Sequence, residues 1–127
     1  MRKVAMLMAT LAILVLMAAT AVYAVNKTCT SRPCSGTNAK DILYEQNGNR
    51  VADAIYGLRQ GDRINAGTFE RDRDQLWGGP GNDRLGTFDD DGLDNLNGGP
   101  GTDTCNGDIG ADFGDAAVNC ERGNLAD

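Results

Sequence analysis

The residues of this sequence best suited to chemistry are aspartates that follow glycine-rich turns. The pattern Gly-Gly-Pro-Gly-x-Asp occurs twice, at 78–83 and 98–103. Glycines bare the backbone carbonyls and the aspartate adds a carboxylate, so each turn offers the hard oxygen ligands that Ca²⁺ prefers. A phosphate-binding loop is excluded, because no Gly-Lys-Ser/Thr follows the glycines. An EF-hand is excluded too, because setting Gly92 sixth puts Thr87 first and Gly98 twelfth.

Aspartates recur along the chain with an apolar residue two positions later. The pattern begins at Asp41, Asp53, Asp62, Asp74, Asp83, Asp94 and Asp103, with a degenerate copy at Asp112. Side chains alternate along a strand, so this offset turns the apolar residue inward. The predicted core is Leu43, Ile55, Ile64, Leu76, Leu85, Leu96 and Cys105. A disordered Gly/Asp-rich linker does not explain the fixed offset.

Composition narrows the classes of function. The formal net charge is −6 at pH 7, which argues against nucleic-acid binding because that requires a basic patch. The chain has no histidine, which removes histidine-based catalytic triads and histidine metal sites. We therefore expect a protein that collects cations.

The first residues have the pattern of an export signal. Arg2 and Lys3 precede an apolar run, and Val22, Tyr23 and Ala24 provide a cleavage site. We predict a signal peptide over residues 1–24, removed after Ala24, and a secreted protein, extracellular or at the cell surface, with no membrane contact after cleavage. A retained membrane anchor is the alternative, because the apolar run is nearly long enough to span a bilayer.

Four cysteines in a short exported chain indicate two disulfides. Three pairings are possible. We favour Cys29–Cys34 and Cys105–Cys120, which place one bridge near each end of the chain. A four-cysteine zinc site is the alternative, but the second pair is spaced too widely for a zinc knuckle.

Residues 78–86 (GGPGNDRLG) and 98–106 (GGPGTDTCN) resemble the haemolysin-type, or RTX, calcium-binding nonapeptide G-G-x-G-x-D-x-U-x, in which U is a large apolar residue. The resemblance implies an all-β, right-handed parallel β-roll, or β-solenoid, with glycine-rich calcium-binding turns. Two nonapeptides form one coil, which gives about four coils. The expected segments are a disulfide-bearing N-terminal segment over 25–35, the RTX-like repeats over 36–115 and a C-terminal cap over 116–127.

In such a roll, successive turns lie on opposite sides, and this decides the expected ligands. One side holds the turns that end at Asp41, Asp62, Asp83 and Asp103, and the other those that end at Asp53, Asp74, Asp94 and Asp112. We predict the best Ca²⁺ site at Asp83 and Asp103 with carbonyls of Gly78, Gly79, Gly81, Gly98, Gly99 and Gly101. A second site is expected at Asp94, Asp112, Gly92 and Gly110, helped by Asp90, Asp91 and Asp108.

A core of one apolar residue per strand is thin, so we expect folding to be coupled to calcium. The predicted function is Ca²⁺ binding outside the cell, with no enzymatic activity, because no room remains for a catalytic domain. The alternative is an adhesion or binding module in which calcium is only structural and a cell-surface, glycan or protein partner uses Tyr56 and Trp77. These two rings are expected on adjacent coils of one face, where they either bind a ligand or brace the strands.

Overall fold

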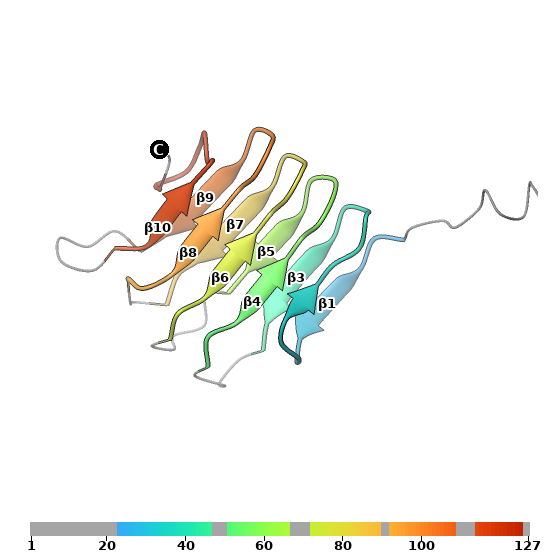
Figure 1. Ribbon diagram of the computed structural model, residues 1–127, viewed down its shortest axis with the longest axis horizontal. Helices are drawn as coiled ribbons and strands as arrows, with labels where there is room; N and C mark the ends of the chain where they lie inside the picture. Colours follow the sequence, from blue (N-terminus) through green and yellow to red (C-terminus); the bar gives the residue numbers. More distant parts are fainter. Residues whose placement is uncertain (1–22, 47–50, 67–71, 90–91, 109–113, 126–127) are drawn as a thin grey trace, which may run out of the picture.

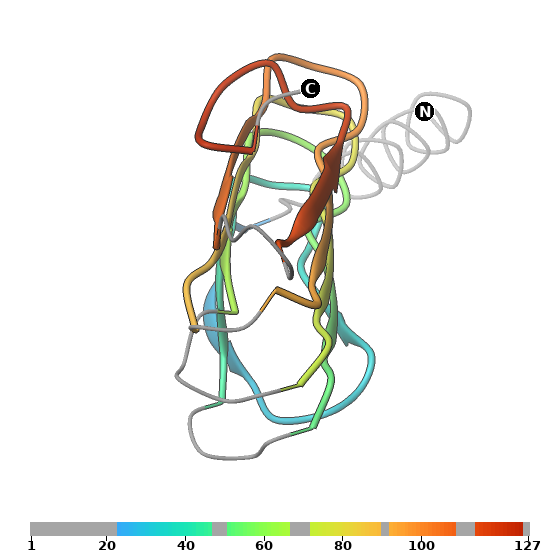
Figure 2. The same cartoon turned by 90° about the vertical axis from the view of Figure 1, so that its left-hand side faces the viewer.

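The computed structural model of the chain describes residues 23–46, 51–66, 72–89, 92–108 and 114–125. Within these ranges the protein is all-β, with short parallel strands in two five-stranded sheets that face each other (Figures 1 and 2). The strands are β1 (Asn26–Cys29), β2 (Cys34–Ser35), β3 (Ile42–Glu45), β4 (Ala54–Tyr56), β5 (Arg63–Asn65), β6 (Gln75–Trp77), β7 (Arg84–Thr87), β8 (Asn95–Asn97), β9 (Thr104–Gly107) and β10 (Ala116–Val118).

The chain passes from one sheet to the other at every turn. The sheet orders are β1-β3-β5-β7-β9 and β10-β8-β6-β4-β2, and every pair of neighbours is parallel. This arrangement is a parallel β-solenoid and confirms the predicted fold class (Figure 1).

The number of coils differs slightly from the prediction. The register Leu43, Ile64, Leu85, Cys105 defines about three full coils, each 20 or 21 residues long, where we expected about four. The first coil is shorter, because β1 pairs with β3 in a register that sets Val25 opposite Asp41, 16 residues on.

The core consists of the inward side chains that the sequence predicted, one row from each sheet. All seven predicted residues, Leu43, Ile55, Ile64, Leu76, Leu85, Leu96 and Cys105, are at most 1% exposed. They fill the space between the sheets, and partly buried Val25, Ala117 and Leu125 pack against them. The predicted core is confirmed.

A disulfide lies at each end of the core. Cys29–Cys34 and Cys105–Cys120 are bonded, with Cα–Cα distances of 5.5 and 5.8 Å, and these are the pairs favoured from the sequence. Closing the longer of the two loops stabilises the fold by roughly 3 kcal/mol through the unfolded state.

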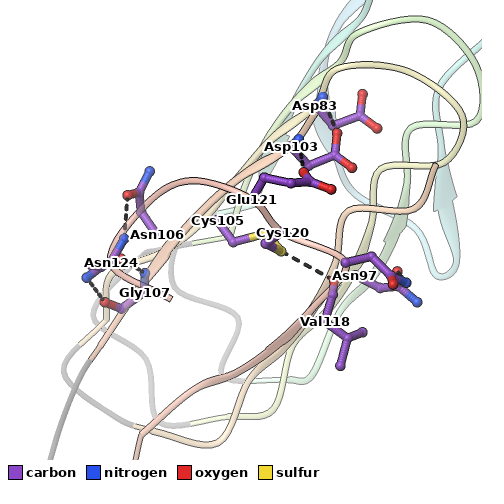
Figure 3. The surroundings of a disulfide bond; sticks show 11 residues. Asp83, Asn97, Asp103, Cys105, Asn106, Gly107, Val118, Cys120, Glu121 and Asn124 are labelled. Atoms are coloured by element: carbon purple, nitrogen blue, oxygen red, sulfur yellow. Dashed lines mark hydrogen bonds between the residues drawn. A yellow bond between two sulfur atoms is a disulfide. The ribbon is translucent and has the colours of Figure 1, made fainter. Parts of the chain in front are cut away.

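The last described residues cover the outer edge of β9 (Figure 3). The backbone carbonyl of Arg122 accepts the N–H of Cys105 at 2.9 Å, and the Asn124 side chain donates to the carbonyl of Gly107 at 2.6 Å. Because an uncovered strand edge invites pairing with another chain, this segment acts as a cap. Ala116–Val118, which we expected in the cap, instead form β10 and continue the second sheet.

Truncating one core residue should test how much the thin core contributes. We expect Leu85→Ala to lower the free energy of unfolding by about 2–5 kcal/mol, because Leu85 is 1% exposed and its loss leaves a cavity. The matched control is Arg84→Ala, on the exposed face of the same strand. This variant should change the free energy of unfolding by less than about 0.5 kcal/mol. Urea denaturation followed by circular dichroism measures the stability of both variants. Equal effects would contradict a core formed by the inward side chains.

Candidate metal centre

Buried aspartates form a ladder on each side of the solenoid. In each rung formed by two aspartates, Oδ1 of one accepts the peptide N–H of the other, which lies one coil earlier. On the first side, Asp62, Asp83 and Asp103 accept from Asp41, Asp62 and Asp83 at 2.6–2.7 Å. On the second side, Asp74, Asp94 and Asp115 accept from Asp53, Asp74 and Asp94 at 2.7, 2.7 and 3.2 Å. The carboxylates therefore hold adjacent coils together.

The ladders confirm the predicted division into two sides and correct one position. The residue that continues the second ladder is Asp115, because Ala116 pairs with Asn95 and Oδ1 of Asp115 accepts the N–H of Asp94. The sequence interpretation gave this place to Asp112, which, like Gly110, lies outside the described residues. The physical reason is the long connection on this side: the step from Asp103 is 12 residues, as it is from Asp41 to Asp53.

The second carboxylate oxygen of the central rungs has no protein partner. Within the described residues, Oδ2 of Asp62, Asp74, Asp83, Asp94 and Asp103 is buried and accepts no hydrogen bond. Asp115 differs, because its Oδ2 accepts from the Thr87 hydroxyl and the Asp108 N–H, both at 2.8 Å. A buried, unpaired carboxylate oxygen requires either a proton or a cation.

Burial raises the pKa of these carboxyl groups. It raises the pKa of Asp74 and Asp94 to about 8, of Asp83 to about 7 and of Asp62 to about 6. Desolvation is the largest cause, the backbone hydrogen bond of the ladder opposes it, and nearby carboxylates add to it. For Asp74 the nearby carboxylates include Asp72 and Glu45, and for Asp94 they include Asp89.

Four buried carboxylates converge on the second side. Asp72, Asp74, Asp89 and Asp94 each place one oxygen within 4.8 Å of the other three, and none is more than 8% exposed. Asp72 and Asp74 lie between β5 and β6, whereas Asp89 and Asp94 lie between β7 and β8. Two adjacent coils thus present an all-oxygen site that could hold a metal ion between them.

The cluster shares one described residue, Asp94, with the second predicted site. Gly92 lies in the same connection, and Asp108 lies beside the cluster, with Oδ2 accepting the N–H of Asp89 at 3.0 Å. Asp90, Asp91 and Asp112 lie outside the described residues. The sequence analysis placed Asp74 on this side but not as a candidate ligand, and it did not single out Asp72 or Asp89. The sequence does carry one signal for these residues: the β5–β6 and β7–β8 connections each contain more acidic residues than the single aspartate that a rung requires.

At the first predicted site, Asp83 and Asp103 belong to a ladder, but neither is part of the carboxylate cluster found within the described residues. Asp83 and Asp103 are neighbouring rungs, as expected. Two of the six predicted glycine carbonyls take part in pairing between coils: Gly78 O accepts from Leu58 at 3.1 Å and Gly98 O from Gly79 at 3.0 Å. Binding of Ca²⁺ by Asp83, Asp103 and these glycine turns stays a prediction.

Tyr56 and Trp77 stack on each other, as the register predicted. Their ring centroids are 4.5 Å apart with an interplanar angle of 6°. One face of each ring is covered by the other, so the pair braces β4 against β6. This geometry supports the bracing interpretation over a flat platform for a sugar.

Comparisons with known proteins do not assign the chain to a family. No family model matches the chain, and no curated protein and no solved structure is significantly similar to it. The two disulfides suggest folding in an oxidising environment. In the described part of the chain, no helix has the length and apolar character needed to cross a membrane.

The raised pKa values predict an unusual dependence of stability on pH in the presence of a chelator. A carboxyl group whose folded pKa exceeds its unfolded value stabilises the fold below the unfolded pKa, and this stability is lost as pH rises through the folded pKa. With Asp74 and Asp94 raised from 3.8 to about 8, the thermal midpoint in EDTA should fall between pH 4 and 8. Circular dichroism melts across this range provide the measurement, and a midpoint that rises with pH would contradict it.

Glycine at the start of each short turn is required by close packing. A Cβ at Gly78 would lie 2.3 Å from Oδ2 of Asp83 and 2.6 Å from the carbonyl oxygen of Gly98. We therefore expect Gly78→Ala to destabilise the fold by about 1–3 kcal/mol. The matched control is Gly86→Ala, because a Cβ there meets only the Asn106 carbonyl, at 3.9 Å. Equal urea midpoints for the two variants would show that the turn has room for a side chain.

Proposed function

We propose that the protein binds Ca²⁺ between adjacent coils of its β-solenoid and that binding is coupled to folding. One observation carries the proposal: four buried carboxylates meet between two coils, and Oδ2 of both Asp74 and Asp94 has no hydrogen-bond partner within the described residues. Four negative charges that are buried together repel one another, and a divalent cation offsets this repulsion.

The donor set favours calcium among the common metals. Calcium takes six to eight oxygen ligands in flexible geometry, and four carboxylates supply part or all of them by binding through one or both oxygens. Zinc, copper and iron prefer nitrogen and sulfur, but the chain has no histidine, and all four cysteines are in disulfides. Magnesium requires a stricter octahedral shell and keeps several waters.

Coupling to folding follows from the position of the ligands. Asp72 and Asp89 lie in different coils, so the cluster exists only when the coils are stacked. An ion that binds the folded state alone stabilises it in proportion to the logarithm of its concentration, by about 1.4 kcal/mol at ten times its dissociation constant.

The setting we propose is extracellular. The predicted signal peptide and the resemblance of 78–86 and 98–106 to the RTX nonapeptide support a secreted or cell-surface protein that meets millimolar calcium. Its proposed role is binding rather than catalysis, with a surface or adhesion role as the broader context.

Removing two of the four charges should abolish the response to calcium without unfolding the protein. Asn is isosteric with neutral Asp and keeps the Oδ1 acceptor, so Asp74→Asn with Asp94→Asn should be more stable than the natural protein in EDTA at pH 8. It should gain nothing from 1 mM Ca²⁺, whereas the natural protein should gain several degrees in thermal midpoint and show a calorimetric heat of binding.

The controls separate the two sides of the solenoid. Asp62→Asn removes a ladder carboxylate outside the cluster and should leave the heat of Ca²⁺ binding intact. If Asp83→Asn with Asp103→Asn abolishes binding and the first pair does not, the ion is held by the first side. No heat at millimolar Ca²⁺ in the natural protein would overturn the proposal, and an equal response to Mg²⁺ would overturn the choice of calcium.

A further inference from the structure

In the first rung of the ladder on the first side, the N–H donor is Val25 and not an aspartate. The peptide N–H of Val25 donates to Oδ1 of Asp41 at 2.6 Å, and the Val25 carbonyl accepts the N–H of Ile42 at 2.8 Å. In the later rungs of this side the corresponding N–H belongs to Asp41, Asp62 or Asp83. Val25 thus occupies the aspartate position of the first coil, and it packs against the core.

The solenoid begins at the same bond where the sequence predicts cleavage. Val25 precedes β1 directly and is partly buried, whereas the Tyr23 side chain is 78% exposed. The cleavage signal, Val22-Tyr23-Ala24, was identified from residue types alone. The hydrogen bond from Val25 is an independent observation that marks the same junction.

We propose that hydrolysis of the Ala24–Val25 peptide bond leaves the Val25 amino group seated on Asp41 as an ammonium ion. A signal-peptidase-type endopeptidase cleaves the amide C–N bond with one water molecule. Ala24 leaves with a carboxylate on the released segment, and the Val25 nitrogen takes up the protons as –NH₃⁺. Processing thereby replaces the neutral peptide donor with a charged one, and the hydrogen bond that ends the ladder becomes a partly buried ion pair.

The surroundings of Asp41 suit a cationic partner. Its side chain is 0% exposed, and its other contacts are to the N–H and hydroxyl of Thr37. An ammonium donor adds Coulomb attraction to the hydrogen bond with the Asp41 carboxylate, and it has three donors where the peptide nitrogen has one. Lys27 on β1 is directed elsewhere, with Nζ 3.3 Å from the carbonyl oxygen of Ser35.

Two further charged groups adjoin this site. Asp62, the next rung, accepts the Asp41 N–H and adds negative charge that favours the ammonium form. Lys40 precedes Asp41 in the chain and carries positive charge that opposes it. The direct contact with Asp41 is the shortest of these interactions and decides the balance.

The test begins with the full chain, leader included, expressed in a host that exports it. Intact mass and N-terminal sequencing should show Val25 as the first residue. Competitive acetylation at pH 8 then measures the reactive, neutral fraction of the α-amine. We expect labelling about tenfold slower in the natural protein than in Asp41→Asn, since loss of the partner returns the amine to its ordinary pKa of about 8.

A matched control and a second variant keep the result interpretable. Asp62→Asn removes a ladder carboxylate that binds a peptide N–H and should leave the labelling rate within about twofold of the natural one. Where Asp41→Asn does not fold, inserting Gly-Ser between Ala24 and Val25 moves the amine away while Asp41 stays, and labelling should become fast. A mature chain that begins at another residue, or equal labelling of the natural and Asp41→Asn proteins, overturns the proposal.

Discussion

The ladder carboxylates lie between coils, where the backbone of the preceding coil satisfies one oxygen of each; in the central rungs the second oxygen is buried with no hydrogen-bond partner within the described residues. The hydrogen bond from the preceding coil, as from Asp83 N–H to Asp103 Oδ1, fixes the register and spacing of the coils. The other oxygen approaches the turn so closely that the turn must begin with glycine, as at Gly78. The same oxygen creates the demand for a proton or a cation.

The two sides differ in what surrounds this second oxygen, which has no partner in the central rungs of either side within the described residues. On the first side the turns are short, and their carbonyls pair with the neighbouring coil. On the second side the connections are long enough to bring extra acids inward, and Asp72 and Asp89 join Asp74 and Asp94. Asp115 needs no ion, because Thr87 and Asp108 satisfy its second oxygen. Within the described residues, the converging carboxylates therefore lie in the middle of the second side.

At both ends of the ladder on the first side, a residue other than aspartate completes the hydrogen-bond pattern. At the C-terminal end, Oε2 of Glu121 accepts the N–H of Asp103 at 2.6 Å, as an aspartate one coil later would (Figure 3). At the N-terminal end, Val25 supplies the N–H that Asp41 requires. These substitutions give the Asp103 N–H and the Asp41 Oδ1 a partner where the repeat ends, and the two disulfides hold the end segments in place.

The sequence by itself determined the repeating unit: an aspartate followed two residues later by a core residue, with successive units on opposite sides. Strand alternation and constant spacing suffice for this, which is why Leu43 and Leu96 were placed correctly. The last aspartate was misplaced at Asp112 because its neighbours match the motif, whereas strand register selects Asp115. Only the tertiary structure decided the candidate ligands. Asp72 and Asp89 obey no repeat, and their carboxylates meet because Asp74 and Asp94, close to them in sequence, are neighbouring rungs of one ladder.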